Sequence, residues 1–170
     1  MSVVYQSAIN VAWNQRGVVF GGYVRDLLCD QVPGDLDLWF HDEEAKSEFL
    51  LGMMKLYPVK LEKDNRTLAN YGFGPECSTI TVEGHKIDLA VHHTSPIGED
   101  SNEQSLADFD VNMLSLEGDR ICLLSPSWFD LSLTDVIRNC VQKRAMTLSH
   151  RPVRRLKMIR KGFEVLNAQS

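Results

Sequence analysis

Long apolar runs are missing from this 170-residue sequence. No stretch approaches the roughly 18 consecutive apolar residues that a membrane-spanning helix needs, and the N-terminus lacks the basic-then-apolar order of a secretion signal. These absences argue against a membrane partner and favour a cytoplasmic protein. Hydrophobic residues make up 44% of the chain and charged residues 24%, the ordinary balance of a globular domain.

Cysteine is also scarce, and its spacing excludes a common class of metal site. Cys29, Cys77, Cys122 and Cys140 are widely separated, without the paired spacing that binds zinc. We therefore expect reduced, mostly buried thiols. The sequence also lacks internal repeats and low-complexity segments, and its length suits one domain with a substantial core.

Acidic residues become scarce only in the last part of the chain. Residues 138–170 hold nine Lys or Arg and one acid, Glu164, whereas the first 137 residues hold nine Lys or Arg and 22 Asp or Glu. An acidic body with a basic tail is typical of a metal-binding domain followed by a helix that contacts a polyanion. It is equally typical of a solvated helix that balances the charge of the body.

A glycine pair follows a short apolar stretch at residues 18–20. Gly21 and Gly22 allow the backbone to approach a ligand closely, with amide groups and a helix N-terminus facing an anion such as a triphosphate. The helix expected after the turn carries Arg25 and Asp26. Arg25 either contacts phosphate through its planar guanidinium or pairs with an acid to fix the helix, and Asp26 is expected to be structural.

Two carboxylates one residue apart follow on the next expected strand. Residues i and i+2 of a strand point to the same face, so Asp35 and Asp37 project together. Asp88, between two apolar residues of a later strand, is the candidate third acid, although a lone strand aspartate is more often a hairpin residue. Three carboxylates beside a phosphate-binding turn indicate Mg²⁺ or Mn²⁺ in phosphoryl transfer.

Hydrophobic periodicity predicts an α+β domain. Helical spacing predicts helices over about 4–15, 43–57 and 133–143, and β-type alternation predicts strands over 59–61, 78–82, 86–91, 109–116 and 120–124. Residues 63–75 and 95–104 are expected to be loops. A last helix is expected over 152–167, with an apolar stripe that packs on the domain: Val153, Leu156, Ile159, Phe163 and Leu166.

The strings GGYVRDLL and GDLDLWF together resemble the signature of DNA-polymerase-beta-like nucleotidyltransferases, in particular the head domain of class II CCA-adding enzymes and bacterial poly(A) polymerases. The resemblance implies a nucleotidyltransferase head at 1–126, built on a mixed, mainly antiparallel sheet flanked by helices, and a helical neck-like segment at 127–170. It implies Asp35, Asp37 and Asp88 as catalytic, metal-binding residues. The implied reaction moves a nucleoside monophosphate from ATP or another nucleoside triphosphate to an acceptor hydroxyl, foremost an RNA 3′ end, with release of pyrophosphate.

A second segment resembles the family stretch that handles the sugar of the incoming nucleotide. Asp108, Phe109 and Asn112 match that stretch. The resemblance implies Asp108 and Asn112 as nucleotide-binding residues, alongside the glycine pair and Arg25. Leu106-Ala107 replace the arginine pair of the family, so residues elsewhere in the chain must neutralise the phosphate charge.

The basic tail resembles the family's neck helix. Arg154 falls on the arginine that, with an aspartate, reads the base edge, and it is therefore a candidate nucleotide contact. His150 and Arg151 stand where the family has an acidic pair, so selection of CTP and ATP cannot be carried over. A basic helix that packs its apolar stripe on the head, without any base contact, explains the same residues.

These departures leave two rival functions open. One is a non-catalytic nucleotide-binding protein that senses or sequesters its ligand, and the other is transfer of the nucleotide to a protein or small molecule. The sequence does not name the base, the acceptor or the oligomeric state.

Overall fold

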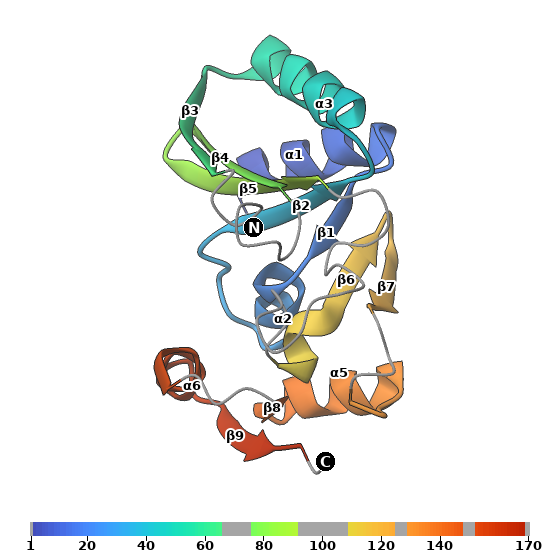
Figure 1. Ribbon diagram of the computed structural model, residues 1–170, viewed down its shortest axis with the longest axis vertical. Helices are drawn as coiled ribbons and strands as arrows, with labels where there is room; N and C mark the ends of the chain where they lie inside the picture. Colours follow the sequence, from blue (N-terminus) through green and yellow to red (C-terminus); the bar gives the residue numbers. More distant parts are fainter. Residues whose placement is uncertain (1, 66–75, 92–108, 125–128, 148–151, 169–170) are drawn as a thin grey trace.

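The computed structural model describes residues 2–65, 76–91, 109–124, 129–147 and 152–168 (Figure 1). The helices are α1 (Val3–Asn14), α2 (Gly22–Leu28), α3 (Glu43–Leu56), α5 (Leu133–Val141) and α6 (Pro152–Arg160), with a short 3₁₀ helix, η1 (Asp110–Met113). The strands are β1 (Val18–Phe20), β2 (Leu36–Phe40), β3 (Val59–Asn65), β4 (Glu76–Val82), β5 (His85–Val91), β6 (Leu114–Glu117), β7 (Arg120–Leu123), β8 (Arg144–Thr147) and β9 (Glu164–Asn167). None of the described helices is long and apolar enough to cross a membrane.

Seven strands form one sheet in the order β3-β4-β5-β2-β1-β6-β7. Only the β2–β5 pair is parallel among these neighbours, and the others are antiparallel. Strands β8 and β9 form a separate parallel pair at the far end of the molecule (Figure 1). The predicted α+β class with a mixed, mainly antiparallel sheet is confirmed.

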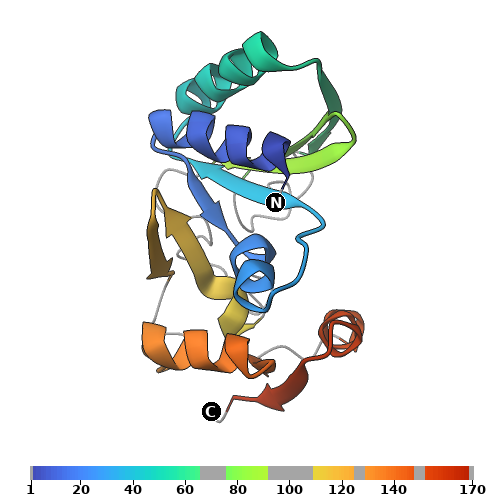
Figure 2. The ribbon, with the colours of Figure 1, turned by 180° about the vertical axis from the view of Figure 1, so that it is seen from behind.

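Helices α1 and α3 cover one face of the sheet at the end opposite α6 (Figures 1 and 2). Each begins at the side-chain cap that its sequence offers, Ser2 for α1 and Asp42 for α3. The buried positions recur at helical spacing, as in Ala8 and Ala12 of α1. The expected helices over 4–15 and 43–57 are therefore confirmed, and they fix one side of the core beneath β2 and β5.

The hairpin of β4 and β5 is confirmed at the expected turn, Glu83-Gly84, where both residues have positive φ. Its register places Thr79 opposite Asp88. In β5 the side chains of Ile87 and Leu89 are fully buried whereas Asp88 is not, so the aspartate faces away from the core.

Two segments differ from the expected secondary structure. Residues 110–113 of the expected strand 109–116 form η1, because the buried Asp110 carboxylate accepts hydrogen bonds from the amides of Val111 and Met146 and from Asn139 Nδ2. The helix expected over 152–167 ends at Arg160, because Gly162 adopts a φ of +87° and residues 164–167 pair with β8 instead. Strand β3 runs to residue 65, further than the expected 59–61.

The face by which α6 packs also differs from the expected one. Val153 is 79% exposed and Ile159 is 53% exposed, whereas Met158 is buried at 2%. The expected apolar stripe is therefore wrong in its first turns, although Phe163 is buried as expected. The face of α6 that carries Met158 also carries the cations Arg154 and Lys157. The division of the chain at residues 126 and 127 stays a prediction.

Candidate active site

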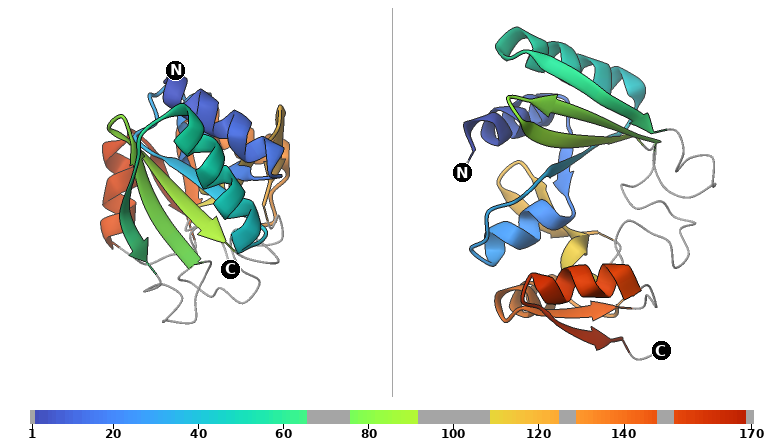
Figure 3. Two further views of the ribbon diagram at one scale, coloured as in Figure 1. Left: turned by 90° about the horizontal axis from the view of Figure 1, so that it is seen from above. Right: turned by 90° about the vertical axis from the view of Figure 1, so that its left-hand side faces the viewer.

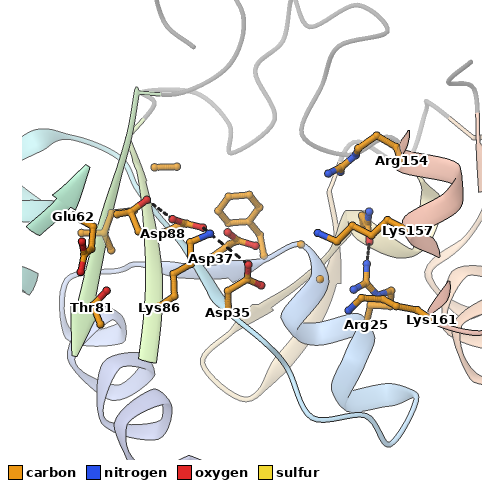
Figure 4. Close-up of a pocket in the computed structure, with 17 residues that line it drawn as sticks. Arg25, Asp35, Asp37, Glu62, Thr81, Lys86, Asp88, Arg154, Lys157 and Lys161 are labelled. Carbon is orange, nitrogen blue, oxygen red and sulfur yellow. Dashed lines mark hydrogen bonds and ion pairs between the residues drawn. The ribbon is translucent and has the colours of Figure 1, made fainter. Parts of the chain in front are cut away.

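A cavity of about 560 Å³ opens between the sheet and α6 (Figure 4). Figure 3 shows α6 at the end of the molecule opposite α3. Its walls come from the ends of β1 and β2, from the β4–β5 hairpin, from the start of α2 and from α6. Eight of the nine predicted site residues line it: Gly21, Gly22, Arg25, Asp35, Asp37, Asp88, Asn112 and Arg154. The ninth, Asp108, lies outside the described residues, as do His92 and His93, which were expected to be structural. The volume lies in the range of small-molecule pockets.

Two of the predicted acids lie side by side because their strands are parallel and in register. Asp37 of β2 pairs with Asp88 of β5, and Asp35, just before β2, faces the same way as Asp37. The side chain of Asp35 is 44% exposed and that of Asp88 is 27% exposed. Figure 4 shows the three carboxylates turned toward the same cavity. Strand alternation predicted that Asp35 and Asp37 project together, and the resemblance implied Asp88 as the third acid.

Asp37 is an acid of the site whose pKa is clearly shifted. Burial, as the largest cause, and the neighbouring charges of Asp35 and Asp88 together raise the pKa of Asp37 to about 7, against a smaller opposing effect of Lys86 and Lys157. A carboxyl held between two others and out of water is stabilised by any cation that can approach it. The cavity therefore favours a cationic or cation-bearing ligand at this wall.

Lys86 and Thr79 hold the third acid in place. The Lys86 ammonium lies 3.0 Å from Asp88 Oδ2 and 3.7 Å from Asp35 Oδ2, and Thr79 Oγ1 donates a 2.5 Å hydrogen bond to Asp88 Oδ1. This contact with Asp88 raises the pKa of Lys86. The sequence reasoning missed both residues. Lys86 lies two positions before Asp88, on the same face of the strand, and Thr79 lies opposite Asp88 across the predicted hairpin. The hairpin register therefore predicts that both residues lie beside Asp88.

The donor set fits a hard divalent cation, although the carboxylates do not enclose one as they stand. No three His, Cys, Asp or Glu side chains in the described part of the chain are arranged closely enough to hold a metal ion. The ammonium of Lys86 lies between two of the three acids. Carboxylate oxygens are the ligands that Mg²⁺ and Mn²⁺ prefer, and burial together with the charges of Asp35 and Asp88 raises the pKa of Asp37. Asp35, Asp37 and Asp88 are the residues that would hold such an ion, in competition with the ammonium of Lys86.

The glycine turn brings the backbone against this acidic wall. Gly21 has a φ of +75°, and a Cβ built on it would lie 3.1 Å from Asp37 Oδ2. A side chain on Gly22 would lie 2.9 Å from Arg25 Nη2. Both positions therefore need glycine, the first for its backbone conformation as well as its size.

Arg25 is engaged by neighbours from three parts of the chain. Its Nε and Nη2 contact Asp26 Oδ1 at 2.8 and 2.7 Å, and its Nη1 donates to Asn112 Oδ1 at 2.5 Å. Lys161 of the segment after α6 lies 2.9 Å from Asp26 Oδ2. Of the two alternatives left open for Arg25, these contacts match the ion pair. The same network ties α2 to the C-terminal segment, which explains the buried Asp26 as a structural residue.

Helix α6 supplies the opposite wall of the cavity. Arg154, Lys157 and Lys161 line it, one helical turn apart (Figure 4). Lys157 is close enough to lower the pKa of Asp37, although burial outweighs it. The sequence predicted Arg154 but not the two lysines, which share its face at positions i+3 and i+7. The cavity thus has an acidic wall on the strands and a basic wall on the helix.

The comparisons with known proteins support the fold. No family model matches the chain, and none of the curated proteins does. Among solved structures, a CCA-adding enzyme in its apo form is similar with a TM-score of 0.63 and 17% identity over 98% of this chain and 40% of that one. A Bacillus stearothermophilus CCA-adding enzyme in complex with CTP is similar with a TM-score of 0.56 and 17% identity, over 98% of this chain and 42% of that one.

A third similar structure is a Thermotoga maritima CCA-adding enzyme complexed with tRNA, with a TM-score of 0.55 and 17% identity over 96% of this chain and 42% of that one. This chain therefore spans about two-fifths of the length of the structures that it resembles. Identities at this level show a shared fold and no more. The fold of the chain is therefore similar to that of the matching part of these CCA-adding enzymes.

Proposed function

We propose that this protein is a metal-dependent nucleotidyltransferase. It moves a nucleoside monophosphate from a nucleoside triphosphate to an acceptor hydroxyl, and pyrophosphate leaves. The observation that carries the proposal is the parallel, in-register pair of Asp37 and Asp88, with Gly21 packed directly against Asp37. A turn that admits polyphosphate beside clustered carboxylates is what a metal-bound triphosphate needs.

In this reaction the acceptor oxygen attacks the α-phosphorus, the bond between the α-phosphorus and the bridging oxygen breaks, and the hydroxyl proton passes to solvent or to a carboxylate. A bound Mg²⁺ or Mn²⁺ would neutralise charge on the attacking and leaving oxygens. Asp37 and Asp88 orient the reacting groups from one wall. Lys157 and Arg154, from the facing helix, balance the negative charge of the triphosphate. This basic wall takes the place of the arginine pair that the sequence lacks at 106–107.

The proposed acceptor is the 3′ end of an RNA. Two observations support it, the excess of nine Lys or Arg over one acid in residues 138–170 and the likeness of the fold to CCA-adding enzymes solved with CTP, with ATP and with tRNA. Phosphate contacts from Lys and Arg supply most of the affinity for nucleic acid and carry no sequence information. RNA binding by this chain should therefore weaken steeply as salt rises.

A pyrophosphate-release assay with each of the four nucleoside triphosphates and a mixed RNA acceptor, with and without Mg²⁺, tests the proposal. We expect release that needs the metal and that falls at least 100-fold in Asp37→Asn and Asp88→Asn. The exposed Glu48 of α3 offers a matched control, since Glu48→Gln also removes one carboxylate but lies outside the cavity. Absence of release from the unaltered protein with every triphosphate and either metal would refute the catalytic proposal.

A second candidate function is nucleotide binding without transfer. The observation that favours it is Lys86, whose ammonium already neutralises Asp35 and Asp88 in the way a metal would. Isothermal titration with each triphosphate separates the two candidates. Tight binding without pyrophosphate release supports the binding protein, and release supports the enzyme. Transfer to a protein or small molecule instead of RNA would appear as pyrophosphate release that does not depend on added RNA.

A further inference from the structure

Two cysteines that are far apart in the sequence meet between α2 and α5. Cys29 directly follows the last residue of α2, and Cys140 lies in the last turn of α5. Their Sγ atoms are 3.2 Å apart. A disulfide bond is about 2.05 Å long, so an approach of little more than 1 Å would join them. Sequence analysis did not predict this pair, whose members lie 111 positions apart in the chain.

The surroundings of the two thiols differ in a way that sets their order of reaction. The Cys29 thiol donates to the Cys140 carbonyl at 3.0 Å, and the Cys140 thiol donates to the Arg25 carbonyl at 3.3 Å. Cys140 is fully buried, whereas Cys29 is only half-buried. An oxidant from solvent therefore meets Cys29 first, and Cys140 is positioned behind it as the resolving thiol.

We propose that Cys29 and Cys140 are a redox modification site that closes to an intramolecular disulfide on exposure to a small-molecule disulfide such as oxidised glutathione. The Cys29 thiolate attacks one sulfur of the small disulfide, expels one thiolate and forms a mixed disulfide. Cys140 then loses its proton, attacks the Cys29 sulfur and expels the second thiolate. Two protein thiols are oxidised by two electrons, the small disulfide is reduced to two thiols, and the two protons end on them.

Closure changes the contacts that position α2. The S–H donors to the carbonyls of Arg25 and Cys140 are lost, and a covalent bond replaces them between α2 and α5. Since the bond closes a long loop in the unfolded chain, oxidation should raise the thermal unfolding midpoint by about 5–15 °C. Burial raises the pKa of the Cys140 thiol, so closure should also accelerate from pH 7 to pH 9.

The test treats the full chain with oxidised glutathione at pH 8 and follows it by intact-mass spectrometry and peptide mapping. We expect a product lighter by two hydrogens, a linked peptide pair that contains Cys29 and Cys140, and recovery of both thiols with dithiothreitol. Cys140→Ser should instead stop at a stable glutathione adduct on Cys29. Cys122→Ser, a substitution of the half-buried cysteine of β7, is the matched control and should close normally.

Two results on the unaltered protein would overturn the proposal without relying on any variant. One is accumulation of the glutathione adduct with no internal bond after prolonged incubation, and the other is a linked pair that involves Cys77 or Cys122. Because mass and peptide mapping need no nucleotide, the outcome is independent of the proposed transferase activity.

Discussion

Replacement of Asp37 by Asn should stabilise the protein, and the gain should depend on pH. Burial, with the charges of Asp35 and Asp88, raises the pKa of Asp37 from 3.8 to about 7, so the folded protein holds a proton on this carboxyl that the unfolded chain releases above pH 4. The stability that this proton confers is complete below pH 4 and is lost as pH rises to about 7. Above pH 7 the folded protein bears the full cost of a buried charge, which an amide avoids.

The size of the effect follows from the size of the shift. A rise of about three pKa units corresponds to about 4 kcal/mol, at roughly 1.4 kcal/mol per unit. This value is an upper limit, because Asp37 is only half-buried by its side-chain exposure and solvent screens part of the charge. We therefore expect Asp37→Asn to raise the free energy of unfolding by about 2–4 kcal/mol at pH 8 and by less than about 0.5 kcal/mol at pH 4.

Urea unfolding followed by tryptophan fluorescence at pH 4 to 8 measures this difference, since Trp39 lies buried in the same strand. Asp35→Asn tests how much burial and how much the charge of Asp35 contribute to the raised pKa of Asp37. Because burial is the largest cause of the shift and Asp35 the second, removal of Asp35 should narrow the pH dependence without abolishing it. Glu48→Gln should follow the unaltered protein at every pH. A gain in Asp37→Asn that is equal at pH 5 and pH 8, or a loss of stability at pH 8, would refute the electrostatic account.

Four further predictions concern single side chains of the site and the core. Gly21→Ala should lower the free energy of unfolding by about 1–2 kcal/mol and abolish nucleotide binding, because φ is +75° and the new Cβ meets a carboxylate; unchanged nucleotide affinity would contradict this. Lys86→Met should tighten Mn²⁺ binding about tenfold, measured by electron paramagnetic resonance, because the ammonium competes with the metal for two carboxylates; an unchanged affinity would show that it does not. Met158→Ala should lower the free energy of unfolding, measured by chemical denaturation, by about 2–4 kcal/mol, and Leu156→Ser should lower it by less than about 0.5 kcal/mol. The reverse order would support packing of α6 by its apolar stripe. Tyr23→Phe should leave stability unchanged or raise it by about 1 kcal/mol in the same assay, because its buried hydroxyl has no hydrogen-bond partner among the described residues; a loss above 1 kcal/mol would reveal one.

Much of the sheet was predictable because its signals are local. The hairpin turn at Glu83-Gly84 sets the register of its strands, and strand alternation alone turns Asp37 and Asp88 out of the core. Neighbouring strands then bring the two acids together. That last step is not local, because the parallel pairing of β2 with β5 joins Asp37 to Asp88 from distant parts of the chain.

The segments that the sequence did not predict depend on distant partners. Residue 110 reads as part of a strand, but its buried carboxylate accepts a hydrogen bond from Met146, 36 positions away, and the backbone turns into a 3₁₀ helix to allow it. The helix expected up to residue 167 stops because Gly162 leaves the helical conformation and the following residues pair with β8. Local propensity carries no information about either partner.

The orientation of α6 also explains why the sequence did not predict the basic wall of the cavity. An apolar stripe of Val153, Leu156 and Ile159 predicts burial of that side, and yet those residues face solvent. The side that packs carries Met158 between cations, one of which, Lys161, pairs with the buried Asp26 at 2.9 Å. Arg25 also pairs with Asp26, at 2.7 Å, so two cations compensate the buried charge of this carboxylate. The basic side of α6 therefore faces the acidic cavity, and the hydrophobic pattern alone predicts the opposite side.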